Sequence, residues 1–144
     1  MVRRSALFAT LALAPAIAGG APVPGELMAD ANIGAFRVFY VLNNKMALTD
    51  ESGMTLYVYA KDETEKSNCT ATCAEQFPPL IANSGERGGF DSFTVFARPD
   101  GQLQWAFEGK PLYRSVRDQK PRDANGHGID GVWSIVGFAA AHEM

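Results

Sequence analysis

The alternation of hydrophobic and polar side chains is most regular in residues 54–59. Successive side chains of an extended chain point to opposite faces, so a period of two residues predicts a β-strand. One face of this strand carries Met54, Leu56 and Val58, and the other carries Thr55, Tyr57 and Tyr59.

Six further segments have the aromatic and β-branched residues, or the flanking turns, that are typical of short strands. They are residues 36–42, 46–49, 93–97, 102–107, 112–114 and 131–138. Turns such as Pro99-Asp100-Gly101 separate them, because proline fixes φ and glycine accepts a positive φ. The pattern predicts a mainly β fold, a small antiparallel β domain. Residues 26–34 are weakly patterned, and we expect a loop there.

Residues 68–76 form the one segment with a helical pattern, and it must stop before Pro78-Pro79. This short helix carries the cysteine pair, Cys69 and Cys73. Residues four apart lie on one helix face with Cα atoms about 6 Å apart, which suits a disulfide. The alternative is a reduced pair that acts as a redox centre or binds copper, with Met46 or Met54 adding a thioether.

The first residues resemble a secretory signal peptide. Arg3-Arg4 precede an apolar run, residues 6–18, that is shorter than the roughly 20 residues of a membrane-spanning helix. We expect cleavage after Ala18 or Ala21 and a periplasmic or secreted protein. The expected organisation is a signal peptide in residues 1–21, a linker in 22–34, one β-rich domain in 35–138 and a tail in 139–144.

Composition narrows the class of protein. Hydrophobic residues make up 47% of the chain and charged residues 20%, which excludes a disordered protein. The formal net charge is −3, and it becomes −5 when Arg3 and Arg4 leave with the signal peptide. A mildly acidic exported domain is a poor candidate for binding nucleic acid or an anionic membrane.

An internal repeat relates residues 53–62 to residues 109–118, an offset of 56 residues. Glycine, leucine, tyrosine and aspartate match, and a basic residue precedes each aspartate. The repeated unit is Tyr-x4-Asp: Tyr57 to Asp62, and Tyr113 to Asp118.

These units resemble the bacterial family of secreted repeats of unknown function, which is marked by tandem Tyr-x4-Asp units in exported proteins. The similarity runs from about Lys45 to Val136 and includes the cysteine pair, Pro78-Pro79-Leu80 and Gly131-Val132-Trp133. The chain departs from the family pattern at Phe77, where tryptophan is common, and at Ser134, where histidine often stands. Many relatives carry a lipid on a cysteine after the signal peptide, but residues 15–22 contain none, so we expect no lipid anchor. The resemblance implies a fold and a compartment.

The repeated tyrosines and aspartates are the strongest site candidates. In a structural interpretation, Asp62 and Asp118 accept hydrogen bonds from turn amides or from the tyrosine hydroxyl of the facing repeat. In a functional interpretation, both units present a Tyr/Asp surface to one ligand. Trp105 and Trp133 lie on alternating strands, where core packing is the default and an exposed binding patch is the alternative.

Weaker candidates lie near the C-terminus. Asp118, Asp123, Asn125 and Asp130 crowd a glycine-rich loop whose oxygens suit calcium, although the spacing is not that of an EF-hand and turn chemistry explains it equally well. His127 and His142 share no metal-binding spacing. We expect no cofactor.

The sequence contains no Gly-x-Ser-x-Gly motif, no His-Glu-x-x-His motif and no phosphate-binding loop. The leading hypothesis is therefore a non-enzymatic binding or interaction module of the cell envelope, whose partner is another envelope protein or a small ligand. The alternative is a periplasmic redox or metal accessory protein that carries copper or haem.

Overall fold

The computed structural model describes residues 32–33, 35–89 and 92–138 of the chain. The predicted signal peptide and the C-terminal tail lie outside these ranges. The elements in chain order are β1 (Asn32–Ile33), β2 (Phe36–Tyr40), η1 (Leu42–Asn44), β3 (Met46–Asp50), β4 (Tyr57–Tyr59), α2 (Thr72–Gln76), β5 (Phe93–Ala97), β6 (Leu103–Phe107), β7 (Lys110–Pro111), η2 (Ile129–Gly131), β8 (Trp133–Ile135) and β9 (Gly137–Phe138).

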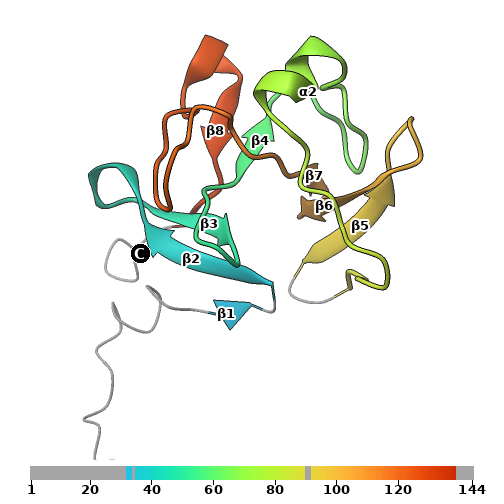
Figure 1. The fold of residues 1–144 in the computed structure, drawn as a ribbon, viewed down its shortest axis with the longest axis horizontal. Helices are drawn as coiled ribbons and strands as arrows, with labels where there is room; N and C mark the ends of the chain where they lie inside the picture. The colour runs from blue at the N-terminus through green and yellow to red at the C-terminus, as the bar shows by residue number, and fades with distance from the viewer. Residues whose placement is uncertain (1–31, 34, 90–91, 139–144) are drawn as a thin grey trace, which may run out of the picture.

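The predicted mainly β fold is confirmed. Within the described ranges the strands form antiparallel sheets with the orders β1-β2-β3-β9, β4-β8 and β5-β6-β7. The β2–β3 and β5–β6 hairpins lie on opposite sides of the molecule, and α2 and η2 lie at the same end of it (Figure 1). None of the described helices has the length and apolar content needed to span a bilayer.

Several element boundaries differ from the prediction. β1 lies within residues 26–34, where we expected a loop, and it pairs with β2. Such a short strand has almost no pattern of its own in the sequence. The helix begins at Thr72, because Ala71 has a φ of 50°, so only Cys73 lies on it and Cys69 precedes it. The predicted strand 112–114 is an extended segment in which Tyr113 forms single bridges to both Tyr57 and Pro79.

The two-faced pattern of residues 54–59 has a direct structural counterpart. Leu56 is buried in one hydrophobic cluster, with Phe36, Leu48 and others, and Val58 packs against that cluster. Tyr57 is buried in a second cluster on the opposite face, and Tyr59 packs against that one. Neighbouring residues therefore serve two separate cores, because the strand is covered on both sides.

The two repeats build equivalent halves, and each half is completed by the end of the other repeat. In one half the backbones of Leu48, Leu56 and Val136 form a closed ring of three hydrogen bonds, 2.9–3.4 Å long. Val136 ends the second repeat, whereas the other two residues belong to the first. The equivalent ring, with bonds of 2.9 Å, joins Trp105, Leu80 and Leu112. This exchange of end segments ties the halves into one unit.

Candidate functional site

The tyrosines of the two repeats meet at the centre of the molecule. The amide of Tyr57 donates to the carbonyl of Tyr113 at 2.8 Å, and the reverse bond is 3.0 Å long. Both side chains are fully buried. This reciprocal bridge between equivalent residues places the pseudo-twofold axis of the repeats between the two tyrosines.

Each tyrosine hydroxyl reaches the aspartate of the other repeat. Tyr57 donates to Asp118 Oδ2 and Tyr113 donates to Asp62 Oδ2, each at 2.6 Å. The hydroxyl of Tyr57 also accepts the amide of Gly126 at 3.2 Å, whereas that of Tyr113 lies 2.7 Å from the hydroxyl of Ser67. The tyrosine of each repeat therefore bonds to the aspartate of the other repeat across the axis.

The second oxygen of each aspartate holds a loop. Asp62 Oδ1 accepts the amide of Asn68 at 2.7 Å, and the side chain of Asn68 donates to the carbonyl of Lys61 at 2.7 Å. In the other repeat Asp118 Oδ1 accepts the amide of Asn125 at 2.9 Å, and the side chain of Asn125 donates to the carbonyl of Arg117 at 3.1 Å. We call these two Tyr–Asp–Asn arrangements the clamps. The bonds are those that the structural interpretation expects.

Burial shifts the pKa of the tyrosines and aspartates of the clamps. It raises the pKa of Asp62 and Asp118, while the hydrogen bonds that each carboxylate receives act in the opposite direction. Burial, together with the neighbouring carboxylate, raises the pKa of Tyr57 and Tyr113 well above the ordinary tyrosine value. Both hydroxyls are therefore protonated donors at neutral pH, and neither is poised to act as a base.

Arg98 extends one clamp into the core, and no sequence pattern indicated this role. Its guanidinium donates to Ser67 Oγ at 3.0 Å, to Gln104 Oε1 at 2.6 Å and to the carbonyl of Cys69 at 3.0 Å. The residue is 6% exposed. It occupies a turn that reads as ordinary surface sequence, so only the three-dimensional structure reveals a buried cation.

Aromatic rings stack beside the axis. Phe77 and Trp133, which are 56 residues apart and equivalent in the repeats, stack with ring centroids 3.7 Å apart and planes within 6°. Tyr59 stacks on Trp133, with centroids 4.5 Å apart. Trp133 and Trp105 are both buried, so the expected core packing of the tryptophans is confirmed.

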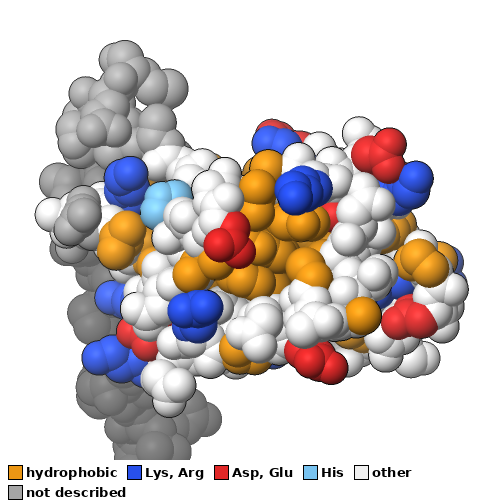
Figure 2. Space-filling view, turned by 90° about the horizontal axis from the view of Figure 1, so that it is seen from above, with side chains coloured by type: hydrophobic (Ala, Val, Ile, Leu, Met, Phe, Trp, Pro, Cys, Tyr) orange, Lys and Arg blue, Asp and Glu red, His pale blue; other side chains and the backbone are white. Residues whose placement is uncertain are grey.

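A cavity of about 290 Å³ opens over this stack, and we call it the axial cleft. Tyr59, Phe77 and Trp133 line it, with Lys61, Arg117 and Asp130 at the polar positions. Eight of its ten lining residues form four repeat-equivalent pairs, namely Lys61 with Arg117, Cys73 with Ile129, Gln76 with Val132, and Phe77 with Trp133. The cleft therefore straddles the axis. Figure 2 shows hydrophobic side chains gathered in the middle of the face that carries α2 and η2, with basic side chains on either side.

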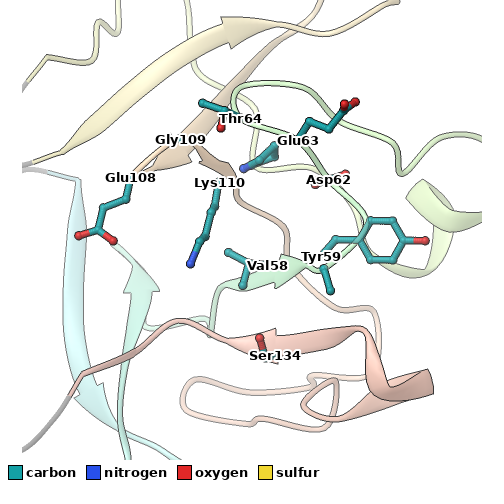
Figure 3. A pocket seen from close by; sticks show the side chains of 11 residues that line it. Val58, Tyr59, Asp62, Glu63, Thr64, Glu108, Gly109, Lys110 and Ser134 are labelled. Atoms are coloured by element: carbon teal, nitrogen blue, oxygen red, sulfur yellow. The ribbon is translucent and has the colours of Figure 1, made fainter.

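A second cavity, of about 380 Å³, adjoins the first along Tyr59, which lines both. Asp62, Lys110 and Ser134 also contribute to it, and the side chain of Lys110 extends from β7 toward the side of β4 that carries Val58 (Figure 3). Its lining does not repeat across the axis. The two repeats therefore contribute different residues to this second cavity, whereas they contribute equivalent residues to the axial cleft.

The remaining predicted residues have local structural partners. Cys69 and Cys73 form a disulfide, which confirms the predicted pairing. Asp123 accepts the amides of Gln119 and Lys120, and His127 Nδ1 accepts the amide of Ile135. Asp130 lies at the axial cleft. In the part of the chain that the structure describes, no three His, Cys, Asp or Glu side chains gather as a metal-binding group would.

Comparison with known families agrees with the repeat geometry. A profile of the family described as a secreted repeat of unknown function matches residues 44–80 and 94–137, together more than half of the chain. The chain belongs to this family. The two matched segments correspond to the two repeats, and the family description makes the protein an exported one. No curated protein and no solved structure matches the chain.

Proposed function

We propose that this member of the secreted-repeat family is a non-enzymatic binding module of the cell envelope, released by cleavage of its signal peptide, and that the axial cleft is its binding site. The observation that carries the proposal is the construction of the cleft from equivalent residues of both repeats. Its volume of about 290 Å³ is just below the range for small-molecule sites, roughly 300 Å³ and above, which favours a small ligand.

The clamps support a binding role rather than a catalytic one. Their tyrosine hydroxyls and carboxylates already bond to each other and to backbone amides, so these groups are committed to holding loops in place. Those loops carry Lys61 and Arg117 to the cleft. In this proposal the repeated motif is a scaffold, and the residues that it positions form the recognition surface.

The test is a screen of the mature protein against a panel of small neutral, cationic and anionic molecules by ligand-observed NMR. A variant that fills the cleft, Gln76→Trp, is compared with Gln102→Trp, which places the same indole on an exposed turn outside it. We expect at least one class of compound to bind the wild type and Gln102→Trp but not Gln76→Trp. Hits that bind all three proteins equally, or the absence of any hit, would contradict the proposal.

A further inference from the structure

Two basic side chains flank the axial cleft without a counterion from the protein. Lys61 and Arg117 are exposed, and among the described residues neither forms a salt bridge. They are equivalent in the repeats, so they lie on opposite sides of the axis. Asp130 is the acidic residue of the lining, which leaves the cleft with an excess of positive charge in a protein whose formal net charge is −3.

The backbone of each basic residue is fixed. The carbonyl of Lys61 accepts the side-chain amide of Asn68, and the carbonyl of Arg117 accepts that of Asn125. A cation whose main chain is held in place loses less conformational entropy on binding than one on a free loop. The clamps therefore hold the main chain of Lys61 and Arg117, the two unpaired cations on opposite sides of the axis.

The floor between the two cations is apolar. It is made of the stack of Tyr59, Trp133 and Phe77, with Ile129 and Val132 beside it. An apolar body lying on this floor leaves water, and acidic groups at its two ends meet a cation each. Arginine suits a carboxylate especially well, because its planar guanidinium offers two parallel donors.

We infer that the axial cleft binds a compact organic dianion, with a ring-shaped apolar body and an acidic group at each end, one for Lys61 and one for Arg117. This inference rests on the proposed function and names the ligand class of the same site. It also gives a role to the basic residue that precedes the aspartate in both repeats.

The experiment is calorimetric titration of the mature protein with three probes of one ring size. Terephthalate carries two opposed carboxylates, benzoate carries one, and benzyl alcohol carries none. We expect affinity to fall in that order. Added salt weakens the binding of terephthalate because it screens the exposed cations, and it leaves that of benzyl alcohol unchanged.

The variants Lys61→Gln and Arg117→Gln remove one cation each, and Lys120→Gln is the control, because it removes an exposed cation outside the cleft lining. We expect each cleft variant to bind terephthalate about tenfold more weakly, which corresponds to about 1.4 kcal/mol. The control should stay within about twofold of the wild type, because its charge lies outside the cleft lining and is exposed to screening by salt. The affinity for benzyl alcohol should not change. Melting temperatures report whether every variant is folded.

The outcomes separate the two proposals. The inferred ligand class, a dianion, is wrong if terephthalate binds no better than benzyl alcohol, or if it binds the cleft variants as tightly as the wild type. The proposed function survives that result when other compounds still fail to bind Gln76→Trp. If Gln76→Trp binds terephthalate normally while Lys61→Gln does not, the anion binds outside the cleft, and the ligand class is wrong for this site.

Discussion

The hydroxyl of Tyr57 donates a 2.6 Å hydrogen bond to Asp118, which lies 61 residues further along the chain. Tyr113 has the same relation to Asp62. Each bond joins one repeat to the other, so the spacing of tyrosine and aspartate within a repeat does not create the contact. The contact requires both repeats to be folded against each other around the Tyr57–Tyr113 bridge.

Removing one clamp hydroxyl should therefore destabilise the whole protein. In Tyr57→Phe, Asp118 loses a donor in a half-buried site and the amide of Gly126 loses its acceptor. We expect the free energy of unfolding to fall by about 1–3 kcal/mol, measured by urea denaturation.

The matched control is Tyr59→Phe. The hydroxyl of Tyr59 forms no hydrogen bond with the described residues, so its loss should change stability by no more than about 0.5 kcal/mol. Equal effects of the two substitutions would mean that the clamp bonds add nothing beyond the packing of the tyrosine rings.

The clamp tyrosines also predict a loss of stability at alkaline pH. Their pKa is raised well above the ordinary value, so they keep their protons while the protein is folded. Tyrosines of the unfolded chain lose theirs near pH 10. Above that pH the unfolded state binds fewer protons than the folded state, and the free energy of unfolding falls as pH rises, by up to about 1.4 kcal/mol per pH unit for each tyrosine.

The measurement is the slope of the unfolding free energy against pH between about pH 9 and pH 11. Tyr57→Phe lacks one of the two groups, so its slope should be shallower than that of the wild type. An unchanged slope in Tyr57→Phe would show that other groups cause the alkaline loss.

Arg98 should be far more important for stability than its turn sequence suggests. Arg98→Met removes the donor to all three acceptors; Ser67 and Cys69 still bond to each other, whereas Gln104 Oε1 loses its donor in the interior. Leaving a buried acceptor without its charged donor costs about 1–3 kcal/mol. The exposed Arg87→Met serves as the control and should change the free energy of unfolding by less than about 0.5 kcal/mol. A small effect of Arg98→Met would indicate that the network forms only weakly.

The disulfide should contribute only modestly to the free energy of unfolding. Cys69 and Cys73 are separated by only four positions, so the cross-link removes little entropy from the unfolded chain. Replacing both by alanine should lower the free energy of unfolding by about 2 kcal/mol and leave the protein folded. The readout is urea denaturation of the variant beside the oxidised wild type. Failure of the variant to fold would show that the bridge organises the loop before α2.

The local features of the fold follow from the sequence because they depend on neighbours in the chain. Alternation at residues 54–59 predicts the two faces of β4, and Pro99-Asp100-Gly101 marks the turn between β5 and β6. The predicted pairing of Cys69 with Cys73 is confirmed, but not by the helix geometry from which it was predicted, because Cys69 precedes the helix. The helix is predicted too long, because nothing local announces the left-handed backbone at Ala71.

The parts of the site that depend on long-range contacts do not follow from the sequence. The repeat indicates that Tyr57 and Tyr113 are equivalent, but not that they meet at the axis. The burial of Arg98 depends on its contacts with Ser67 and Cys69, 31 and 29 residues earlier in the chain, and the face-to-face stack of Phe77 on Trp133 joins the two repeats. The sequence shows that a basic residue, Lys61 or Arg117, precedes the aspartate in both repeats. It does not indicate that the two residues line the same cleft.

Gly126 is a glycine because two aromatic rings leave no room for a side chain. A Cβ at this position would lie 2.9 Å from the ring of Phe77 and 3.0 Å from that of Tyr57, and both rings are held in the buried cluster around the axis. We expect Gly126→Ala to lower the free energy of unfolding by about 1–3 kcal/mol, as overpacking a filled core does.

The matched control for this substitution is Gly137→Ala in β9. A Cβ there lies 3.9 Å from the carbonyl oxygen of Met46, which is ordinary contact. Chemical denaturation should show Gly137→Ala close to the wild type and Gly126→Ala clearly below it. Because Gly126 also donates its amide to the hydroxyl of Tyr57, overpacking should disturb the clamp as well. Gly126→Ala and Tyr57→Phe should therefore be less than additive in the double variant. Full additivity would mean that the rings make room without moving the Tyr57–Asp118 bond.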